Sequence, residues 1–261
     1  MEDHTGRQGM SFRERTAIIA GDAGMEALAR ASVAVYGLGG VGGAAAMDLV
    51  RAGVGRIVAL DFDRVQESNL NRLCFAYLED VGLPKAEVFA RRALSINPSI
   101  AVEAQEAFMS GGDAAAFIVN CDIHLDCIDA LNPKISLLAA LAEGGATFAS
   151  SLGTAGRLDP GRLRLGTVWE SHGCPLAREV RNRLRRRGVT ADFPAVWSDE
   201  EAARPRPRPE GAEEAQTAPG RVRNIMGSSP CVPQAAGHLL AAWAIRLILG
   251  QESGRLHEQS N

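Results

Sequence analysis

The sequence of 261 residues lacks several features that would place it in a specialised class. Its five cysteines form no Cys-x-x-Cys pair, which argues against a paired-thiolate zinc site and against a disulfide framework. Its formal net charge is only −3, so any contact with nucleic acid has to come from a local basic patch. We find no internal repeat. Widely spaced cysteines in a chain of this size predict a reducing, cytoplasmic location.

Long apolar runs are also scarce. The first nine residues are polar and mixed in charge, which predicts that no signal peptide is present. The most apolar segment, 235–249, contains His238 and Arg246 and is shorter than the ~20 residues that a transmembrane helix needs. We therefore expect a buried C-terminal helix and no stable membrane insertion. Attachment to a membrane surface stays open.

Short apolar runs alternate with helical segments over the first 150 residues. Strands are expected at 33–36, 57–60, 100–104, 123–127 and 147–150, and helices at 14–30, 41–52, 84–96, 114–120 and 133–143. A strand, a glycine turn, a helix and a second strand in succession fit a right-handed βαβ crossover. Strands that alternate with helices predict a mostly parallel α/β sheet with flanking helices.

The second half of the chain has a different pattern. Residues 162–168 alternate as an antiparallel strand does, and residues 174–187 repeat as an amphipathic helix. Residues 200–223 are rich in Pro, Glu, Arg and Ala and bury too little apolar surface to order, so we expect a mobile loop. A final helix reaches about Leu249. The predicted fold is a Rossmann-like, mostly parallel sheet with flanking helices, continued by antiparallel strands and a C-terminal helix.

A glycine-rich turn between the first strand and the second helix predicts a nucleotide site. Its glycines are Gly37, Gly39, Gly40 and Gly42. Without side chains the backbone can approach phosphates, and the helix N-terminus supplies free N–H groups and the positive end of a dipole. Asp61 ends the next strand, where an acidic residue usually binds ribose hydroxyls. The turn alone leaves NAD, FAD, S-adenosylmethionine and ATP open.

Charged residues downstream separate these nucleotides. Asp63, Arg72 and Lys85 follow the turn, and Asp129 follows the fourth strand. Hydride transfer needs no Arg and Lys near the phosphates, whereas attack on the α-phosphorus of a triphosphate builds negative charge that they would stabilise. Asp129 is expected to hold Mg²⁺ at the carboxyl edge of the sheet. The alternatives are surface positions for Arg72 and Lys85 and a helix cap for Asp129; Asp126 is interpreted as structural.

Together these motifs resemble the ubiquitin-activating-enzyme-like superfamily, the ThiF-type adenylating enzymes. The resemblance is carried by the glycine turn, Asp-Phe-Asp at 61–63, Ser-Asn-Leu-Asn-Arg at 68–72, Leu-Pro-Lys-Ala-Glu at 83–87 and Asp-Cys-Ile-Asp at 126–129. It implies ATP and Mg²⁺ as cofactors, with nucleotide contacts from Asn69 and Asn71. It also implies a homodimer in which an N-terminal arginine, best matched by Arg15, reaches the ATP of the partner.

The second half is similar to the tRNA threonylcarbamoyladenosine dehydratase family. The matching motifs are Gly-Arg-Leu-Asp-Pro at 156–160, Cys-Pro-Leu-Ala at 174–177, Ala-Val-Trp-Ser-Asp-Glu-Glu at 195–201 and Gly-Ser-Ser-Pro-Cys-Val-Pro at 227–233. That family adenylates the threonyl carboxylate of the modified adenosine at tRNA position 37, and the activated carboxyl then cyclises onto the carbamoyl group with loss of AMP. The resemblance implies one ThiF-type domain over 1–261, with an ATP-binding half at 12–150 and a substrate-binding half at 151–261.

A second activity stays open. Adenylation of the C-terminus of a small ubiquitin-like or sulfur-carrier protein uses the same nucleotide site, with a sulfur-relay protein as partner. The sulfur-transfer members of the superfamily carry two Cys-x-x-Cys zinc pairs, and this chain has none. The missing pairs favour the dehydratase interpretation and tRNA as the partner.

The helix expected at 174–187 is the candidate tRNA surface. It contains six arginines, and its apolar residues recur every four positions and are expected to face the core: Leu176, Val180 and Leu184. Arginines on the remaining faces could contact the tRNA backbone, and we select Arg178, Arg181 and Arg185. The alternative is an ordinary solvated helix face.

Two cysteines are candidate nucleophiles for a thioester formed after adenylation. Cys174 follows His172 and opens the basic helix, where a cation and a helix N-terminus would lower the pKa of a thiol. It is therefore a better candidate than Cys231. The dehydration needs no covalent carrier, because the carbamoyl group can attack the adenylate directly, so we favour structural roles for both cysteines.

Overall fold

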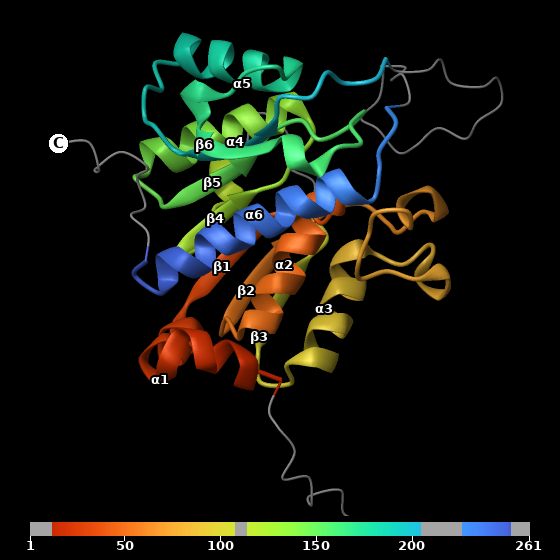
Figure 1. The fold of residues 1–261 in the computed structure, drawn as a ribbon, viewed down its shortest axis with the longest axis vertical. Coiled ribbons are helices and arrows are strands. Elements are labelled where there is room, and N and C mark those ends of the chain that lie inside the picture. Colours follow the sequence, from red (N-terminus) through yellow and green to blue (C-terminus); the bar gives the residue numbers. More distant parts are fainter. Residues whose placement is uncertain (1–11, 108–113, 205–225, 252–261) are drawn as a thin grey trace, which may run out of the picture.

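The structure is a computed structural model that describes residues 12–107, 114–204 and 226–251. Within them, one sheet has the strand order β3-β2-β1-β4-β5-β7-β6 (Figure 1). The strands are β1 (Ser32–Tyr36), β2 (Arg56–Leu60), β3 (Ala101–Gln105), β4 (Ile123–Asp126), β5 (Phe148–Ser151), β6 (Leu163–Thr167) and β7 (Pro194–Ser198). All neighbours pair in parallel except β6 and β7, which are antiparallel. The predicted mostly parallel sheet with an antiparallel continuation is confirmed.

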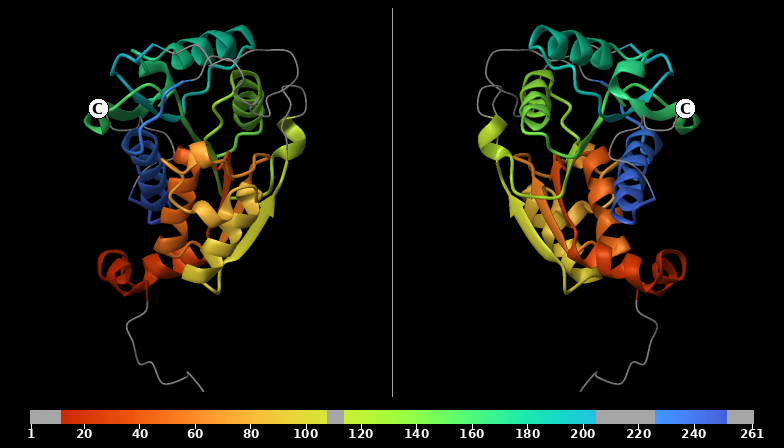
Figure 2. Two further views of the ribbon diagram at one scale, coloured as in Figure 1. Left: turned by 90° about the vertical axis from the view of Figure 1, so that its right-hand side faces the viewer. Right: turned by 90° about the vertical axis from the view of Figure 1, so that its left-hand side faces the viewer.

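Helices cover both faces of this sheet. They are α1 (Glu14–Arg30), α2 (Gly40–Ala52), α3 (Lys85–Ile96), α4 (Leu131–Glu143), α5 (Pro175–Arg186) and α6 (Cys231–Ile248), with short 3-10 turns at Glu67–Asn69, Leu78–Asp80, Ala114–Phe117, Pro160–Arg162 and Val168–Glu170. Alternate residues of β1 separate two cores: Val33 and Val35 pack with α2, α3 and α6, whereas Ala34 and Tyr36 pack with α4 and α5. The side views place α1 and α5 at opposite ends of the molecule (Figure 2).

The order in which strands are added reverses between β1 and β4. From β1 the chain builds outward through β2 and β3, then crosses to β4 and continues to β5 on the other side. Ligands of open parallel sheets bind outside the carboxyl ends of the strands at such a reversal. Here the two strands end side by side, because a Cβ added to Gly37 would lie 3.0 Å from the carbonyl oxygen of Cys127. The topology therefore places the glycine turn beside the segment that leads to Asp129.

The C-terminal helix α6 packs directly on α2. A Cβ on Gly237 would lie 2.2 Å from the carbonyl oxygen of Val41, so only glycine allows this close crossing. Trp243 has no exposed surface. By length and composition alone α6 could cross a membrane, as buried core helices often could, and 44% of its apolar window is buried inside the fold. The predicted C-terminal helix is confirmed, and its first turn lies against the nucleotide half of the chain.

Three elements differ from the sequence prediction. The prediction lacks β7, whose five residues are all buried and therefore show no alternation of apolar and polar side chains. Residues 114–120, expected as a helix, form only the 3-10 turn Ala114–Phe117. The helix α1 is broken at Gly21, which has a φ of 68°. Most of the loop predicted at 200–223 lies outside the described residues.

Candidate active site

The glycine turn joins β1 to α2 at the carboxyl edge of the sheet. Gly37 has a φ of 92°, and a Cβ on Gly42 would lie 1.8 Å from the carbonyl oxygen of Gly37. Gly39 is the N-cap of α2 and offers no side chain to the first helical N–H groups. A Cβ built on Gly39 would meet no described atom within 4 Å. The N-terminus of α2 therefore faces open space with uncapped N–H groups, as helices that bind phosphate do.

Asp61 fixes this turn from the end of β2. Its Oδ2 accepts the backbone N–H of Leu38 at 2.6 Å, and its Oδ1 accepts that of Asp63 at 2.7 Å. Burial raises the pKa of the Asp61 carboxyl, and the positive charge of Lys85 opposes that shift. Each carboxylate oxygen has a second lone pair, so these bonds are compatible with the predicted ribose contact. Asp61 also orients the loop, a role that its position in the sequence does not reveal.

Lys85 begins α3 and points back toward the glycine turn. Its side chain is 7% exposed, and its Nζ lies 2.7 Å from Asp63 Oδ2 and 3.9 Å from Asp61 Oδ1. Its backbone N–H also donates to the carbonyl oxygen of Asp63. The alternative of an ordinary surface lysine is therefore wrong. Asp61, Asp63 and Lys85 form one charged group next to the N-terminus of α2.

Arg72 lies over the same turn. A Cβ on Gly40 would be 3.1 Å from Arg72 Cγ, so the arginine stem packs on the start of α2. Its Nη1 donates to the carbonyl oxygen of Ser68 at 3.1 Å and to Asn71 Oδ1 at 2.9 Å. Burial lowers the pKa of Arg72, and the charge of Asp129 opposes that shift. Arg72 is half-buried and makes no ion pair with another described residue, which argues against the alternative of a surface ion pair.

The two asparagines of the 68–72 motif hold the loop in place. The Oδ1 of Asn69 lies 3.4 Å from the backbone nitrogen of Gln66. Asn71 Nδ2 donates to the carbonyl oxygen of Ser228 at 2.8 Å, while its Oδ1 accepts from Arg72. The nucleotide contact of Asn71 stays a prediction; in the structure its amide also positions Arg72 and joins the two halves of the chain.

Asp129 is exposed at the edge of the sheet. The helix that follows has Ala130 as its N-cap and no side-chain cap, so the capping alternative for Asp129 is wrong. Among the described residues, no group of three or more His, Cys, Asp or Glu could hold a metal. Mg²⁺ usually keeps several waters and takes one or two carboxylates together with substrate phosphates. Asp129, a single exposed carboxylate at the edge of the sheet, fits a site of that kind.

A buried polar cluster stabilises the end of β4, which leads to Asp129. Lys134 and Asp126 form an ion pair with no exposed surface. The ammonium group also donates to the carbonyl oxygen of Ser151 at 2.8 Å, and the Ser150 hydroxyl donates to Asp126 Oδ2 at 2.6 Å. The structural interpretation of Asp126 agrees with this geometry. Lys134 is not among the residues predicted from the sequence. Its position as a lone lysine in an otherwise apolar helix is the signal that could have identified it.

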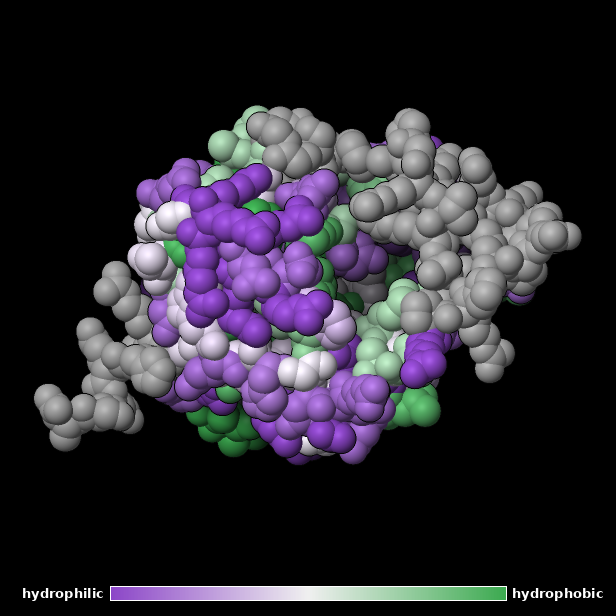
Figure 3. Space-filling view, turned by 90° about the horizontal axis from the view of Figure 1, so that it is seen from above, coloured by the Kyte–Doolittle hydropathy of each residue, from purple (hydrophilic) through white to green (hydrophobic). Residues whose placement is uncertain are grey.

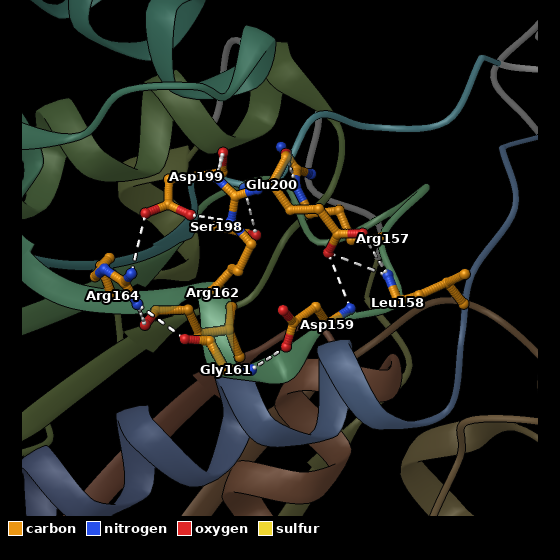
Figure 4. A network of polar contacts seen from close by, with 10 residues as sticks. Arg157, Leu158, Asp159, Gly161, Arg162, Arg164, Ser198, Asp199 and Glu200 are labelled. Atoms are coloured by element: carbon orange, nitrogen blue, oxygen red, sulfur yellow. Dashed lines mark hydrogen bonds and ion pairs between the residues drawn. The ribbon is translucent and has the colours of Figure 1, made fainter.

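In the second half of the chain, a polar network links residues 157–164 to residues 198–200 (Figure 4). Arg157, 2% exposed, donates from Nε to the carbonyl oxygen of Glu200 at 3.1 Å. The Glu200 carboxylate accepts the backbone N–H of Leu158, which with the neighbouring N–H lowers the pKa of Glu200. Gly156 donates to the carbonyl oxygen of Gly227 and accepts from the backbone N–H of Ala203, both at 2.7 Å. Gly156 is therefore hydrogen-bonded both to the segment that contains Ala203 and to the segment that leads into α6.

Arg15 lies far from the glycine turn of its own chain. It is exposed on α1, at the end of the molecule opposite α5 (Figure 2). Its neighbour Arg13 packs at Gly53, which caps the C-terminus of α2, whereas the glycine turn lies at the N-terminus of that helix. A helix of this length spans about 20 Å. Within one chain, Arg15 therefore does not join the site.

The arginines of α5 divide into two kinds. Arg178 and Arg185 are exposed, and the guanidinium of Arg185 lies 4.8 Å from the ring centre of Trp169. Arg181 instead turns inward and donates to the backbone and hydroxyl oxygens of Ser171. Burial lowers the pKa of Arg181. The expectation that Arg181 contacts tRNA phosphates is therefore corrected: its guanidinium is bound to the protein. On the apolar side, Ala177 is buried in place of the predicted Leu176, which is half-buried.

Cys174 caps α5. Its Sγ accepts the backbone N–H of Ala177 at 3.4 Å, and the residue is 5% exposed. This geometry fits the structural role favoured from the sequence, because the sulfur is occupied and shielded from solvent. Cys231 is exposed as the first residue of α6.

Comparison with known proteins agrees with this geometry. The ThiF family model matches residues 13–261. The tRNA threonylcarbamoyladenosine dehydratase of Bacillus subtilis is 35% identical over 187 residues, which cover 71% of this chain and 74% of that protein. The enzyme of the same name from Escherichia coli is 34% identical over 179 residues, 67% of either chain. The crystal structure of the Escherichia coli tRNA N6-threonylcarbamoyladenosine dehydratase in complex with ATP has a TM-score of 0.78 and 27% identity, covering 92% of this chain and 94% of that chain.

Proposed function

This chain belongs to the ThiF family, and from that premise we propose that it catalyses the ATP-dependent, cyclising dehydration of threonylcarbamoyladenosine at position 37 of tRNA. The observation that carries the proposal is the meeting of Arg72 and Lys85 at the uncapped N-terminus of α2. Its relatives of 34–35% identity are named for that reaction. A cytoplasmic location, where tRNA and ATP are both present, is part of the proposal.

In the first step, an oxygen of the threonyl carboxylate attacks the α-phosphorus of ATP. A P–O bond forms, the bond to pyrophosphate breaks, and an acyl-adenylate results. Negative charge builds on the phosphates during this step, and preorganised cations stabilise it. Lys85 is held by Asp63, whose side chain is 42% exposed, so water can take over that carboxylate when a phosphate replaces it. Asp129 would hold Mg²⁺ together with the phosphates, and the ion would neutralise part of their charge.

In the second step, the carbamoyl group attacks the activated carbonyl carbon and AMP leaves. The oxygen lost from the carboxylate departs on the phosphate of AMP, so the net change in the nucleoside is loss of water. This chemistry needs no covalent carrier on the protein, and the capping role of Cys174 supports that reading. The protein contributes by holding adenylate and nucleoside together, since orientation of two reacting groups accounts for much of an enzymatic rate.

We extend the proposal to a homodimer in which Arg15 acts on the nucleotide of the partner subunit. Ile18 and Ile19 on α1 are 75% and 82% exposed, and Phe12 beside them is 41% exposed. Exposed apolar residues that lie together mark interaction surfaces. Mixing Arg15→Ala subunits with Lys85→Ala subunits should restore activity, because each mixed dimer then has one intact composite site. Lack of rescue, with subunit exchange confirmed separately, would contradict a role in trans.

The deciding experiment is mass spectrometry of tRNA nucleosides after incubation of the protein with ATP–Mg²⁺ and tRNA that carries threonylcarbamoyladenosine. The cyclic nucleoside should appear with the wild-type protein and not with Lys85→Ala. If no cyclic product forms, but the protein adenylates the C-terminus of a sulfur-carrier protein in the presence of its relay partner, the alternative activity is correct. The absence of Cys-x-x-Cys pairs is the observation that disfavours that alternative.

A further inference from the structure

A cavity of about 500 Å³ opens between α4 and the last turns of α5. Its lining is Asn132, Ile135, Arg183, Arg186 and Arg187. Ile135, 2% exposed, gives the cavity an apolar floor, while the other four residues surround it with polar groups. Seen from above, hydrophilic residues gather on the left-hand part of the molecule, with paler and apolar residues between them (Figure 3). The volume lies within the roughly 300–1,000 Å³ of ordinary ligand sites.

The positive charge of this cavity is poorly compensated. Arg183 Nη1 donates to Asn132 Oδ1 at 2.8 Å, and Arg187 Nη1 donates to the Ser136 hydroxyl at 3.3 Å. Both acceptors are neutral. Arg186 makes no hydrogen bond or ion pair to another described residue, and the carboxylate of Glu179 lies only at the margin, 3.9 Å from Arg183 Nε. Three guanidinium groups in one cavity repel one another, and a bound anion would relieve that repulsion.

Stabilisation of the helix C-terminus explains the arginines only in part. Basic residues in a last helical turn do interact favourably with the helix dipole. Arg183 and Arg187, however, turn sideways onto the beginning of α4, which is the positive end of that helix. The first turn of α4 has no acidic residue and no side-chain cap. The arginines therefore add to a positive potential that no acidic residue in the first turn of α4 neutralises.

The cavity also lies close to the candidate active site. Asn132 follows Asp129 by three residues, so their Cα atoms are at most about 11 Å apart. We propose that the arginine cavity, formed by Asn132, Arg183, Arg186 and Arg187 over Ile135, binds a phosphate of the tRNA backbone next to the nucleoside that is adenylated. The identity of the nucleic acid as tRNA rests on the proposed function. Arginine suits the site because its planar fork binds phosphate through two parallel hydrogen bonds.

The test is tRNA affinity measured at several salt concentrations, with the threonylcarbamoyl-modified tRNA as the probe. The variant Arg186→Gln/Arg187→Gln changes two exposed residues and should fold normally. We expect tRNA affinity to fall roughly tenfold or more, as for the loss of a charge-assisted hydrogen bond. The log–log salt slope should flatten by roughly 0.7–0.9 for the one phosphate contact that is lost. ATP affinity should stay at the wild-type value.

The matched control is Arg51→Gln, an exposed arginine in the last turn of α2, at the end of that helix away from the site. It removes positive charge without touching the cavity, and it should leave the salt slope unchanged. Arg186→Lys should weaken tRNA binding less than Arg186→Gln does, because a charge remains near the phosphate although the two parallel hydrogen bonds are lost.

Each outcome separates this proposal from the proposed function. If the wild-type protein forms the cyclic nucleoside but the double variant keeps the wild-type salt slope, the cavity proposal is overturned and the function stands. If the slope flattens but the wild-type protein makes no cyclic product, the function fails and the phosphate site stands. An equal loss of affinity in Arg51→Gln, or a wild-type protein that binds no tRNA, overturns the cavity proposal.

Discussion

Two lysine–aspartate pairs lie near the candidate active site, and they differ chiefly in how far water can reach them. Lys134 and Asp126, between β4, β5 and α4, have no exposed surface. Lys85, the first residue of α3, is 7% exposed, but its partner Asp63, which follows β2, is 42% exposed. The residue types are the same, and both pairs belong to the nucleotide half of the chain.

The difference in exposure gives the two pairs different capabilities. In the buried pair, the serines of β5 satisfy the remaining polar atoms, so removal of either partner leaves a charge that nothing can solvate. In the open pair, the aspartate can be hydrated when the lysine moves to a phosphate. Accessibility therefore makes one pair a rigid support for the Asp129 segment and makes the other a site where a ligand can replace a carboxylate.

The same substitution at both lysines would test this comparison, and the largest effect should come from the buried one. Lys134→Met should lower the free energy of unfolding by about 3–5 kcal/mol, because it leaves Asp126 buried and unpaired. Urea denaturation measures the change. The double variant Asp126→Asn/Lys134→Met should lose less stability than Lys134→Met alone, since no charge stays unpaired. If the single variant is the more stable of the two, the pair is not a support.

Lys85→Met should show the opposite profile. We expect kcat to fall by roughly 10²–10³, as when one preorganised donor is removed from a transition state. The free energy of unfolding should fall by less than for Lys134→Met, because Asp63 can be hydrated and the buried Asp61 keeps the N–H groups of Leu38 and Asp63. Single-turnover formation of the adenylate and urea denaturation check the two halves of this prediction. A loss of stability as large as that of Lys134→Met would remove the distinction between the pairs.

Asp129→Asn should affect turnover and leave the fold intact. The residue is exposed and does not cap α4, so the free energy of unfolding should stay within about 0.5 kcal/mol of wild type. Turnover with ATP–Mg²⁺ should drop on the order of 10², because a phosphate-bound ion would lose its protein ligand. Kinetics at several Mg²⁺ concentrations would measure this. Wild-type turnover at every concentration would exclude a metal role for Asp129.

The smallest effect concerns a buried group whose partner carries no charge. His124 on β4 is hydrogen-bonded to the Tyr36 hydroxyl at 3.0 Å, and burial lowers the pKa of its imidazole. The unfolded chain therefore binds a proton below the ordinary pKa of 6.5 while the folded chain does not. Stability from this residue is complete above pH 6.5 and is lost as the pH falls below it. His124→Gln should flatten the pH dependence of the urea midpoint below 6.5; an unchanged slope would contradict the assignment.

Local signals identify the nucleotide turn and the charged residues around it. The glycine turn, Asp61 and Lys85 are recognisable in the sequence because a strand, a tight turn and a helix follow one another within a short stretch, and the turn imposes glycine where a side chain would collide. The alternation of strands and helices likewise fixed the parallel sheet. The strand β7 was missed because a fully buried strand of five residues has no alternation to detect.

Only the tertiary structure decided which charged side chains are bound to other parts of the protein and which can bind a ligand. The six arginines of residues 174–187 look equivalent in the sequence, yet Arg181 is bound to Ser171, ten residues earlier, and Arg183 to Asn132, fifty-one residues earlier. Helical spacing predicts the face on which a residue lies, but its partners come from segments that the fold brings alongside. The free energy of a charged group depends on those partners and on its hydration. Sequence therefore determined the chemistry of the nucleotide turn, whereas the packing of α5 on α4 determined which arginines can meet a phosphate.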